Sequence, residues 1–450
     1  SNMDLKRMLM QLAVGKVSEC PFDSKIIEDV RDNLRIICKQ SARNDGLPRE
    51  GDVVQHFEIR LIQAMLEVFE DPDAYFCTWW ARGTWLGSPS RKLPRAPAVF
   101  DRKTKWRKFE VTSELHGGWL TNSPSLQEHT ALVQRQFEAE ETEGLMGKMK
   151  VREAMAKWGD DLNIASTGAI AKKGRTDEVR VIFDGSHGID LNPGIKVRDQ
   201  VKFPVAADGK AVMTEIADEG GPHFSLHIDF SKAHRRVATL EEEWGRQACQ
   251  VKGTAAAAAK LALRAMATAE RKVFESSGKR AALTPRVRPR LEDLSEEVLD
   301  EDIWVNKVGT FGIASAGYWW GRAGACVVRL SHYLQGIDHM IFSLLYSDDE
   351  WLIGRTDRFE RGLMLHMFIL AVINAPLAWH KVGGGIQSDW VGYYLDVGRF
   401  EIGVSELRAA WAVRWLEDKG RERTVRLGEL REGLGRLQFI AGPLEHIRPF

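Results

Sequence analysis

The sequence predicts an α+β fold, in which helical segments and strand hairpins occupy separate stretches of the chain. Apolar residues recur at helical spacing from Asp4 to about Glu70. Residues 223–230 alternate apolar and polar side chains, which is typical of a half-buried strand. The runs 341–346 and 351–353 are nearly all apolar and flank a short polar turn, so they predict a hairpin whose strands suit the middle of a sheet.

Length and composition limit what the chain can be. Its 450 residues suffice for about three domains. Its 63 Lys and Arg balance its 63 Asp and Glu, so any charged surface must be local. The five cysteines lack the spacing of a zinc site or a disulfide framework, and no run of about 18 apolar residues occurs. We therefore expect a soluble, intracellular protein with no membrane partner, without distinguishing cytoplasm from nucleus.

The first 125 residues are expected to form a largely helical extension. Within it, residues 71–85 are rich in aromatic side chains, and residues 91–108 are rich in Lys and Arg, with Asp101 as the only acid. Such a stretch can follow a phosphate backbone and stack on bases. It can also be a basic loop beside a satellite aromatic core, and we favour this second interpretation.

The middle of the chain contains a hairpin pattern and an interruption. A helical tract at 126–158 leads to residues 166–186, whose β-branched run after a polar, glycine-containing turn predicts a hairpin. Residues 253–299 are first Ala-rich and then rich in Pro and charge. Because the segments on either side belong together, we interpret this stretch as an insertion.

The C-terminal segment, residues 404–450, is predicted to be a small helical bundle. Short helical patterns alternate there with glycines at 420, 428 and 435, which we expect to end the helices. The basic residues between 421 and 436 either lie along a nucleic-acid duplex or solubilise the helix faces.

Three aspartates stand out because two of them are adjacent at the predicted hairpin tip. Asp is common in turns because its side chain bonds its own backbone, so Asp348 and Asp349 alone indicate little. Asp229, however, ends the polar face of the predicted strand 223–230, and three carboxylates converge if the two strands are neighbours. Convergent acids repel unless a cation is bound, and Mg²⁺ prefers hard oxygen ligands. The pattern therefore predicts a magnesium site.

Two magnesium ions can stabilise the attacking and leaving oxygens of an in-line phosphoryl displacement. A triphosphate substrate would need further cations. Lys173 and Arg180, on the predicted hairpin, can supply them, Lys as a point charge and Arg through a bidentate fork.

Seven short motifs follow one another along the chain. They are AKKGRTDEVRVIFDGSHGIDLN (171–192), HIDFSKAHRR (227–236), TFGIASAGYWWGR (310–322), YSDD (346–349), WHKVGGG (379–385), DWVGYYL (389–395) and LGRLQFIAGPLEHIRPF (434–450). Each motif alone is weak, but their common order is specific. From about residue 130 to 445 the chain resembles the reverse transcriptase family.

This resemblance implies a right-hand polymerase with fingers, palm and thumb, a ferredoxin-like antiparallel palm sheet and a helical N-terminal extension. The implied division is an extension at 1–125, fingers at 126–221, a palm at 222–252 and 300–399, an insertion at 253–299 and a thumb at 400–450. It also implies RNA-directed DNA synthesis with two Mg²⁺ ions, for which Mn²⁺ can substitute. The partners would be an RNA or DNA template with a primer, and nucleoside triphosphates. A longer retroelement polyprotein is one expectation, and the oligomeric state is not indicated.

The resemblance also assigns roles to single residues. Asp229, Asp348 and Asp349 would hold the metal ions together with the backbone oxygen of Phe230, and Lys381 would protonate the leaving pyrophosphate. Nucleotide contacts are implied for Lys173, Arg180, Phe230, Ala233, His234, Phe311 and Gly312, and a primer grip for Trp390, Gly392 and Tyr393. Gly312 is expected to permit close backbone approach to the nucleotide, whereas Trp319 and Trp320 are expected to pack.

One residue departs from the family pattern. After Ala233 the family carries Tyr or Phe, whose ring excludes a 2′-hydroxyl, but His234 stands here. A smaller ring that can hydrogen-bond a ribose hydroxyl puts the choice of deoxynucleotides in doubt. Two alternatives therefore stay open: an RNA-synthesising or template-independent nucleotidyltransferase, and a catalytically inactive scaffold that binds nucleic acid.

Overall fold

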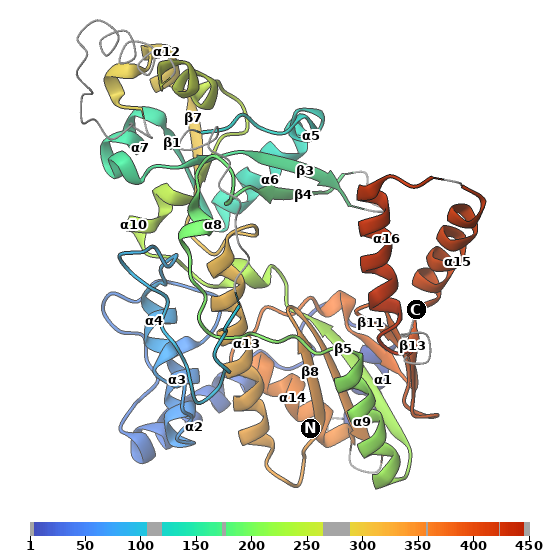
Figure 1. Cartoon of the computed structure of the whole chain (residues 1–450). Coiled ribbons are helices and arrows are strands. Elements are labelled where there is room, and N and C mark those ends of the chain that lie inside the picture. Colours follow the sequence, from blue (N-terminus) through green and yellow to red (C-terminus); the bar gives the residue numbers. More distant parts are fainter. Residues whose placement is uncertain are drawn as a thin grey trace, which may run out of the picture.

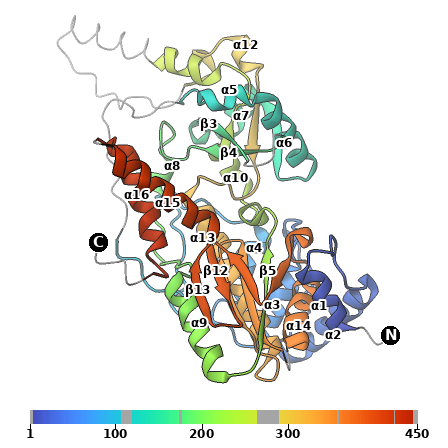
Figure 2. The ribbon, with the colours of Figure 1, turned by 90° about the vertical axis from the view of Figure 1, so that its right-hand side faces the viewer.

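The computed structural model describes residues 4–105, 119–172, 177–263, 289–356, 359–422 and 424–444, with the backbone alone at 359 and 360. They form a mixed helix and sheet structure (Figures 1 and 2). In Figure 1 a central sheet lies low in the molecule, a second sheet lies above it, and two C-terminal helices stand to the right. Within the described residues no helix is both long and apolar enough to cross a membrane.

The central sheet is antiparallel and has the strand order β10-β5-β9-β8. The strands are β5 (His223–Asp229), β8 (Phe342–Tyr346), β9 (Asp349–Arg355) and β10 (Gly383–Gly385). The predicted strand and hairpin are therefore both confirmed. The expectation that both hairpin strands suit the middle of a sheet is wrong for β8, which is an edge strand with half-buried side chains. Its apolar residues reflect partial cover by neighbouring helices rather than a central position.

Both faces of the central sheet are covered, because β9 sends alternate side chains into two cores. Leu352 belongs to the large core, whereas Trp351 and Ile353 belong to a smaller one. The polar face of β5 is covered as well, since Ser225 is fully buried there. The expectation of a half-buried strand therefore holds only near the C-terminal end of β5. The helices involved are α1 (Leu5–Ala13), α9 (Ala206–Glu219), α13 (Ala314–Gln335) and α14 (Phe359–Val372).

The N-terminal residues are helical, as predicted, and pack onto the rest of the chain. The further helices are α2 (Ser24–Ala42), α3 (Ile59–Val68) and α4 (Phe76–Arg82). Phe76, Trp80 and Trp85 are buried in the large core and are unable to stack on bases. The aromatic cluster is not a satellite either, because the Trp319 ring of α13 contacts those of Phe76 and Trp85.

The upper sheet has the order β1-β7-β6-β2, and the β3–β4 hairpin lies beside it. The strands are β1 (Met146–Lys150), β2 (Ile164–Ala165), β3 (Thr167–Ala171), β4 (Val179–Phe183), β6 (Ala248–Cys249) and β7 (Asp302–Asn306). The predicted hairpin is confirmed, and it points toward α16 in Figure 1. The strands β6 and β7, which lie in the ranges assigned above to a palm, pair here with β1 and β2.

The helices of the upper region are short. They are α5 (Pro124–Glu128), α6 (Thr130–Thr142), α7 (Val151–Trp158), α8 (Leu191–Gly194), α10 (Glu241–Trp244) and α12 (Glu296–Leu299). The expectation of one helical tract over 126–158 is wrong, because β1 interrupts it. The sequence MGKMK has little strand character, and its pairing with β7 overrides local propensity. In the predicted insertion, residues 255–263 are helical, and residues 264–288 lie outside the described part.

The C-terminal part joins a small sheet to two helices. Its elements are β11 (Gln387–Trp390), β12 (Tyr393–Asp396), β13 (Glu401–Val404), α15 (Glu406–Arg421) and α16 (Leu427–Ile440). Gly420 lies near the end of α15, but the expectation that Gly428 and Gly435 end helices is wrong, since both lie within α16. A glycine inside a helix costs only about 1 kcal/mol relative to alanine, which packing elsewhere can offset.

Two glycines of α16 should respond in opposite ways to substitution by alanine. A Cβ at Gly433 would collide with the Trp415 ring of α15, whereas a Cβ at Gly435 meets nothing within 4 Å. We expect Gly435→Ala to stabilise the protein by about 0.5–1 kcal/mol, and Gly433→Ala to destabilise it by roughly 1–3 kcal/mol. Urea unfolding of both variants measures this, and equal stabilisation by both would disprove the packing of α15 on α16.

Candidate active site

The register of two neighbouring strands brings the predicted acids together. In the β5–β9 ladder Asp229 lies directly opposite Asp349. The next backbone N–H, that of Phe230, donates to the carbonyl oxygen of Asp348 over 2.9 Å. Residues that face each other in this way have Cβ atoms about 4.5–5.5 Å apart. Asp229 and the Asp348–Asp349 pair, distant in sequence, are therefore neighbours.

The tip of the β8–β9 hairpin is held from outside by a tryptophan. Ser347 adopts a φ of 60°, an uncommon conformation for a residue with a side chain. The indole N–H of Trp320, on α13, donates to the Ser347 carbonyl oxygen over 2.7 Å. The Trp320 ring also packs edge-on against Phe230, with centroids 5.5 Å apart. Trp320 thus packs as expected, and it also fixes the turn that carries the aspartates, which sequence analysis missed.

A buried polar network links the β8–β9 hairpin to α14. Glu350 follows Asp349 and is fully buried, and its carboxylate accepts a hydrogen bond from Ser343. His366 of α14 contacts this carboxylate over 3.2 Å, and its other ring nitrogen lies 2.7 Å from the Ser331 hydroxyl. Burial acts to raise the pKa of Glu350, but the charge and hydrogen bond of His366 outweigh it, so the pKa lies below its ordinary value.

Burial and mutual repulsion raise the pKa of one of the three acids, Asp349. The pKa of Asp349 is raised to about 6 by burial and by the charges of Asp348 and Asp229. Lys381 opposes this shift, because its ammonium group bonds the carboxylate of Asp229. Lys381 is half-exposed, so the predicted motif lysine lies at the acids, paired with Asp229 at the protein surface.

The donor set has the chemistry of a hard-cation site. Asp229 and Asp349 on adjacent strands, with Asp348 in the turn, offer only oxygen ligands, and the Lys381 ammonium supplies part of the positive charge there. Among the described residues, no group of three or more His, Cys, Asp or Glu side chains is arranged so that it could hold a metal ion. In this conformation the positive charge beside Asp229 comes from Lys381 instead.

His234 lies close to these acids. Burial lowers its pKa, and the charge of Asp348 partly opposes that shift. Its ring lies edge-on to the Phe311 ring, with centroids 6.1 Å apart, and Phe311 is 53% exposed. The next residue, Arg235, anchors the turn through Glu140 of α6 and the Asn306 side chain. His234 therefore presents its ring at the site from a fixed backbone, and Ala233 before it is buried.

Gly312 makes a close approach, but to protein rather than to open space. It has a φ of +105°, and a Cβ there would collide with the carbonyl oxygen of Phe183 on β4. The Asn192 amide donates to the Gly312 carbonyl over 2.8 Å and accepts from the Ala314 N–H over 2.8 Å. The junction between the β3–β4 hairpin and α13 thus requires a glycine by itself, and its approach to a nucleotide stays a prediction.

Two further sets of contacts are expected from the sequence, one to the triphosphate and one to the primer. Lys173 lies outside the described residues, and Arg180 is exposed on β4 without a salt bridge to any described carboxylate. The Trp390 and Tyr393 side chains are buried, stacked on Trp351 and Phe439 respectively. Gly392 between them is partly buried and has a φ of +88°, and a primer grip at these three residues stays a prediction.

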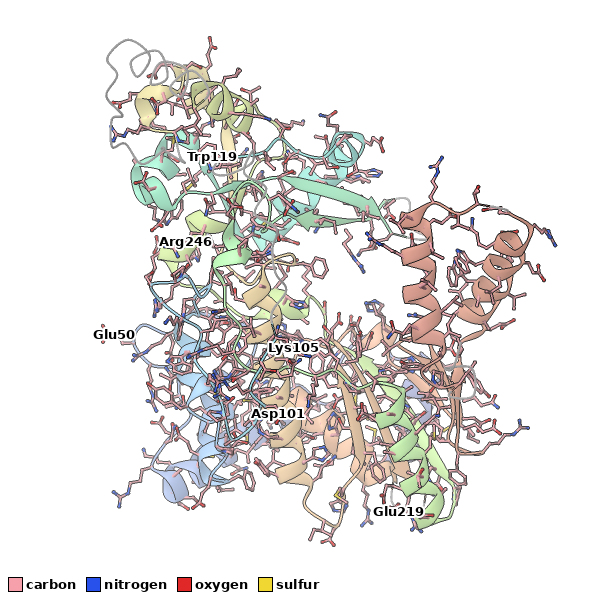
Figure 3. The ribbon with its side chains drawn as sticks, viewed as in Figure 1. Glu50, Asp101, Lys105, Trp119, Glu219 and Arg246 are labelled. Carbon is pink, nitrogen blue, oxygen red and sulfur yellow. The ribbon has the colours of Figure 1, made fainter. Side chains whose placement is uncertain are left out.

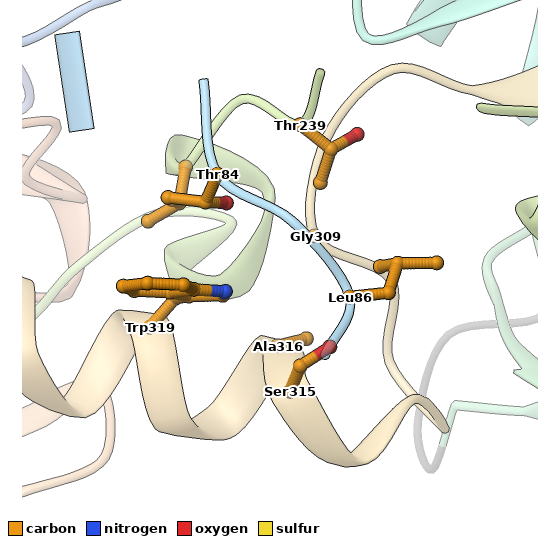
Figure 4. Close-up of a pocket in the computed structure, with 8 residues that line it drawn as sticks. Thr84, Leu86, Thr239, Gly309, Ser315, Ala316 and Trp319 are labelled. Carbon is orange, nitrogen blue, oxygen red and sulfur yellow. The ribbon is translucent and has the colours of Figure 1, made fainter. Parts of the chain in front are cut away.

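A small cavity borders the first turns of α13 and lies above that helix in Figure 4. Its volume is about 10 Å³, enough for roughly one water molecule. The buried hydroxyl of Ser315 lines it and has no hydrogen-bond partner among the described residues. The cavity is too small for a nucleotide, so the acids and His234, rather than this hollow, define the candidate site.

No protein-family model and no curated protein sequence matches this chain. Solved structures similar to it are of foamy viral protease-reverse transcriptase. The complex with dsDNA is 10% identical, with a TM-score of 0.44 over 92% of this chain and 62% of that chain. The complex with an RNA/DNA hybrid is 10% identical, with a TM-score of 0.44 over 90% and 40%. The dRH form with dsDNA is 10% identical, with a TM-score of 0.43, and this chain spans 52% of its length.

The raised pKa of Asp349 makes stability depend on pH. Because the folded pKa of about 6 exceeds the ordinary value of 3.8, the folded state binds the proton more tightly, and stability falls as pH rises between these values. In metal-free buffer we expect Asp349→Asn to melt at a higher temperature than the wild type above pH 7, and this gain to vanish toward pH 4. Thermal unfolding across this range measures it, with the exposed Asp160→Asn as control. A gain independent of pH would contradict the assigned repulsion.

The bond from Trp320 to the hairpin tip can be isolated with a matched pair of variants. Trp319 is also buried on α13, but its indole N–H donates to the Trp85 carbonyl over 2.7 Å. Losing a hydrogen bond of about 1–2 kcal/mol should speed local opening roughly 5- to 30-fold. We expect Trp320→Phe, and not Trp319→Phe, to accelerate amide hydrogen exchange in residues 346–351. Equal acceleration by both variants would show that the tip is not held by Trp320.

Proposed function

We propose that the chain is an RNA-directed DNA polymerase, which joins a primer 3′-hydroxyl to an incoming nucleotide on a template strand. The observation that carries this proposal is the cross-strand pairing of Asp229 with Asp349, with Asp348 bonded to the adjacent residue. Like charges placed directly opposite each other destabilise a sheet. A scaffold that only bound nucleic acid would gain nothing from acids that destabilise its sheet. The arrangement of the aspartates therefore favours catalysis.

Asp229, Asp348 and Asp349 are the residues that would hold two Mg²⁺ ions, with the Phe230 carbonyl as a further ligand and Mn²⁺ as a substitute. Such ions stabilise the attacking and leaving oxygens of a phosphoryl transfer. Lys381, half-exposed beside Asp229, would give a proton to the leaving pyrophosphate. Lys173 and Arg180 would bind the triphosphate from the β3–β4 hairpin.

In this proposal the central sheet is the palm, the upper sheet with the β3–β4 hairpin forms the fingers, and α15 with α16 forms the thumb. The contacts of Gly312 with Phe183 and Asn192 support it, since they couple the hairpin to the helix above the acids. The primer would meet the partly buried turn at Gly392 rather than the buried rings of Trp390 and Tyr393.

A second candidate function is supported by His234. Its ring stands beside the exposed Phe311 at the acids, where a tyrosine or phenylalanine would exclude a ribose 2′-hydroxyl. A smaller ring with hydrogen-bonding nitrogens favours an enzyme that also accepts ribonucleotides. An RNA-synthesising or template-independent nucleotidyltransferase is therefore the alternative.

The proposal is tested by primer extension on RNA and DNA templates with and without Mg²⁺. We expect extension on both templates, and a loss of at least about 10³-fold with Asp348→Ala, because a metal ligand is removed from the reacting centre. Template affinity should stay nearly unchanged. The exposed Asp338→Ala is the matched control. Near-normal synthesis by Asp348→Ala would refute the proposed activity.

The choice of sugar is tested by substituting His234. A tyrosine ring would fill the space for a 2′-hydroxyl, so we expect His234→Tyr to raise the ratio of deoxynucleotide to ribonucleotide incorporation by roughly 10-fold or more. Single-nucleotide extension with matched dNTP and rNTP pairs gives this ratio. If the ratio stays the same, His234 does not contact the sugar.

A further inference from the structure

Two segments far apart in sequence form one basic strip, which we name the basic ribbon: residues 91–105 and 196–202. Arg102 and Asp199 form an antiparallel bridge. The Lys103 N–H donates to the Arg198 carbonyl over 2.8 Å, and the Gln200 N–H donates to the Asp101 carbonyl over 2.8 Å. The ribbon therefore has a defined backbone, although it belongs to none of the larger sheets.

The one acid of the second segment is used to hold the ribbon together. Asp199 is fully buried and accepts from the Arg95 guanidinium over 3.0 Å and from the Ala96 N–H over 2.8 Å. Arg198 donates across to the Leu93 carbonyl over 2.7 Å. The Asp199 carboxylate is therefore buried and neutralised inside the ribbon. The exposed side of the ribbon carries the remaining lysines and arginines.

The ribbon is strongly basic in a chain whose net charge is zero. Its first segment has six basic residues and one acid, and its second has three and one. Asp101 is paired with Lys202. Four further cations of the ribbon have no carboxylate of the described residues within salt-bridge distance: Lys92, Arg102, Lys103 and Lys105. Lys103 is half-buried, and the other three are exposed. Four such charges on one strip suit a polyanion.

The ribbon leads directly to the candidate active site. Val201 packs against Gly321 of α13, and its neighbour Gln200 is bonded to Asp101, which Figure 3 labels. One residue beyond the ribbon, Phe203 stacks at a tilt on Tyr346, with ring centroids 5.1 Å apart. Tyr346 ends the strand before the turn that carries the aspartates. Phe203 is 40% exposed and offers an aromatic face next to the charges.

We propose that the basic ribbon binds the single-stranded part of the template as this strand runs to the candidate active site. This inference rests on the proposed function, because it takes a polynucleotide as the ligand. The ribbon has no helix or regular strand pair to enter a groove of a duplex, so it contacts phosphates. Cations that follow a backbone beside an aromatic face are the general means of binding single strands without reading sequence. The template therefore crosses α13 before it reaches Tyr346.

The test is equilibrium binding in metal-free buffer, using a triple variant, Lys92→Gln/Arg102→Gln/Lys105→Gln, and a labelled RNA or DNA duplex. One duplex is blunt and the other carries a 5′ overhang of about 10 nucleotides. Each phosphate contact to a single strand contributes about 0.7 to the slope of log affinity against log salt. We expect the variant to lose about 2 units of slope and roughly 10- to 100-fold of affinity near 0.1 M salt for the overhang duplex only.

A matched control neutralises three exposed lysines on α1 and α2: Lys6→Gln/Lys25→Gln/Lys39→Gln. This control should bind both duplexes as the wild type does, and both triple variants should keep the wild-type melting temperature. Equal losses for the blunt and overhang duplexes, unchanged binding by the ribbon variant, or a similar loss in the control would each overturn the proposal. The binding assay contains no nucleotide and no metal, so its result does not depend on catalysis. If the wild-type protein failed to extend primers, the polymerase function would be refuted, but the binding result would stand.

Discussion

The antiparallel register of β5 against β9 is the constraint on which the rest of the site depends. It places Asp229 opposite Asp349 although like charges in that position repel. A slip of one residue would turn every side chain of β9 to the other face of the sheet. Trp351 and Ile353 would then leave the core that they fill, and Leu352 would leave the other. Apolar burial on both faces therefore fixes the acids in a position that their charges oppose.

The surrounding structure reinforces this register with polar contacts that are costly to break. Glu350 is fully buried and bonded to Ser343 and His366, so β9 has little freedom to move relative to α14. Trp320 ties the hairpin tip to α13. The same helix begins where Asn192 and Gly312 join it to the β3–β4 hairpin. Through these contacts, α13, α14 and the β3–β4 hairpin are all linked to the hairpin that carries Asp348 and Asp349.

Sequence periodicity predicted the strands and the neighbouring acids, because period-two burial and a polar turn are local signals. It failed where a long-range partner decides the structure. The sequence MGKMK becomes the strand β1 only because β7 pairs with it. Gly428 and Gly435 lie inside α16, since packing offsets their low helix propensity. The support from Trp320 and from His366 was invisible, because each acts across more than ten residues of sequence on a backbone or side chain brought near only by folding.

The most direct test of the central claim is a titration of Mn²⁺ into the protein with primer, template and an incoming nucleotide, followed by electron paramagnetic resonance. If the strand register gathers the acids around shared cations, the wild type binds about two ions. Asp229→Asn, which alters the strand opposite the aspartate pair, should then weaken binding roughly 10-fold or more. If Asp229→Asn binds Mn²⁺ as tightly as the wild type and melts at the same temperature, the three carboxylates do not share a metal.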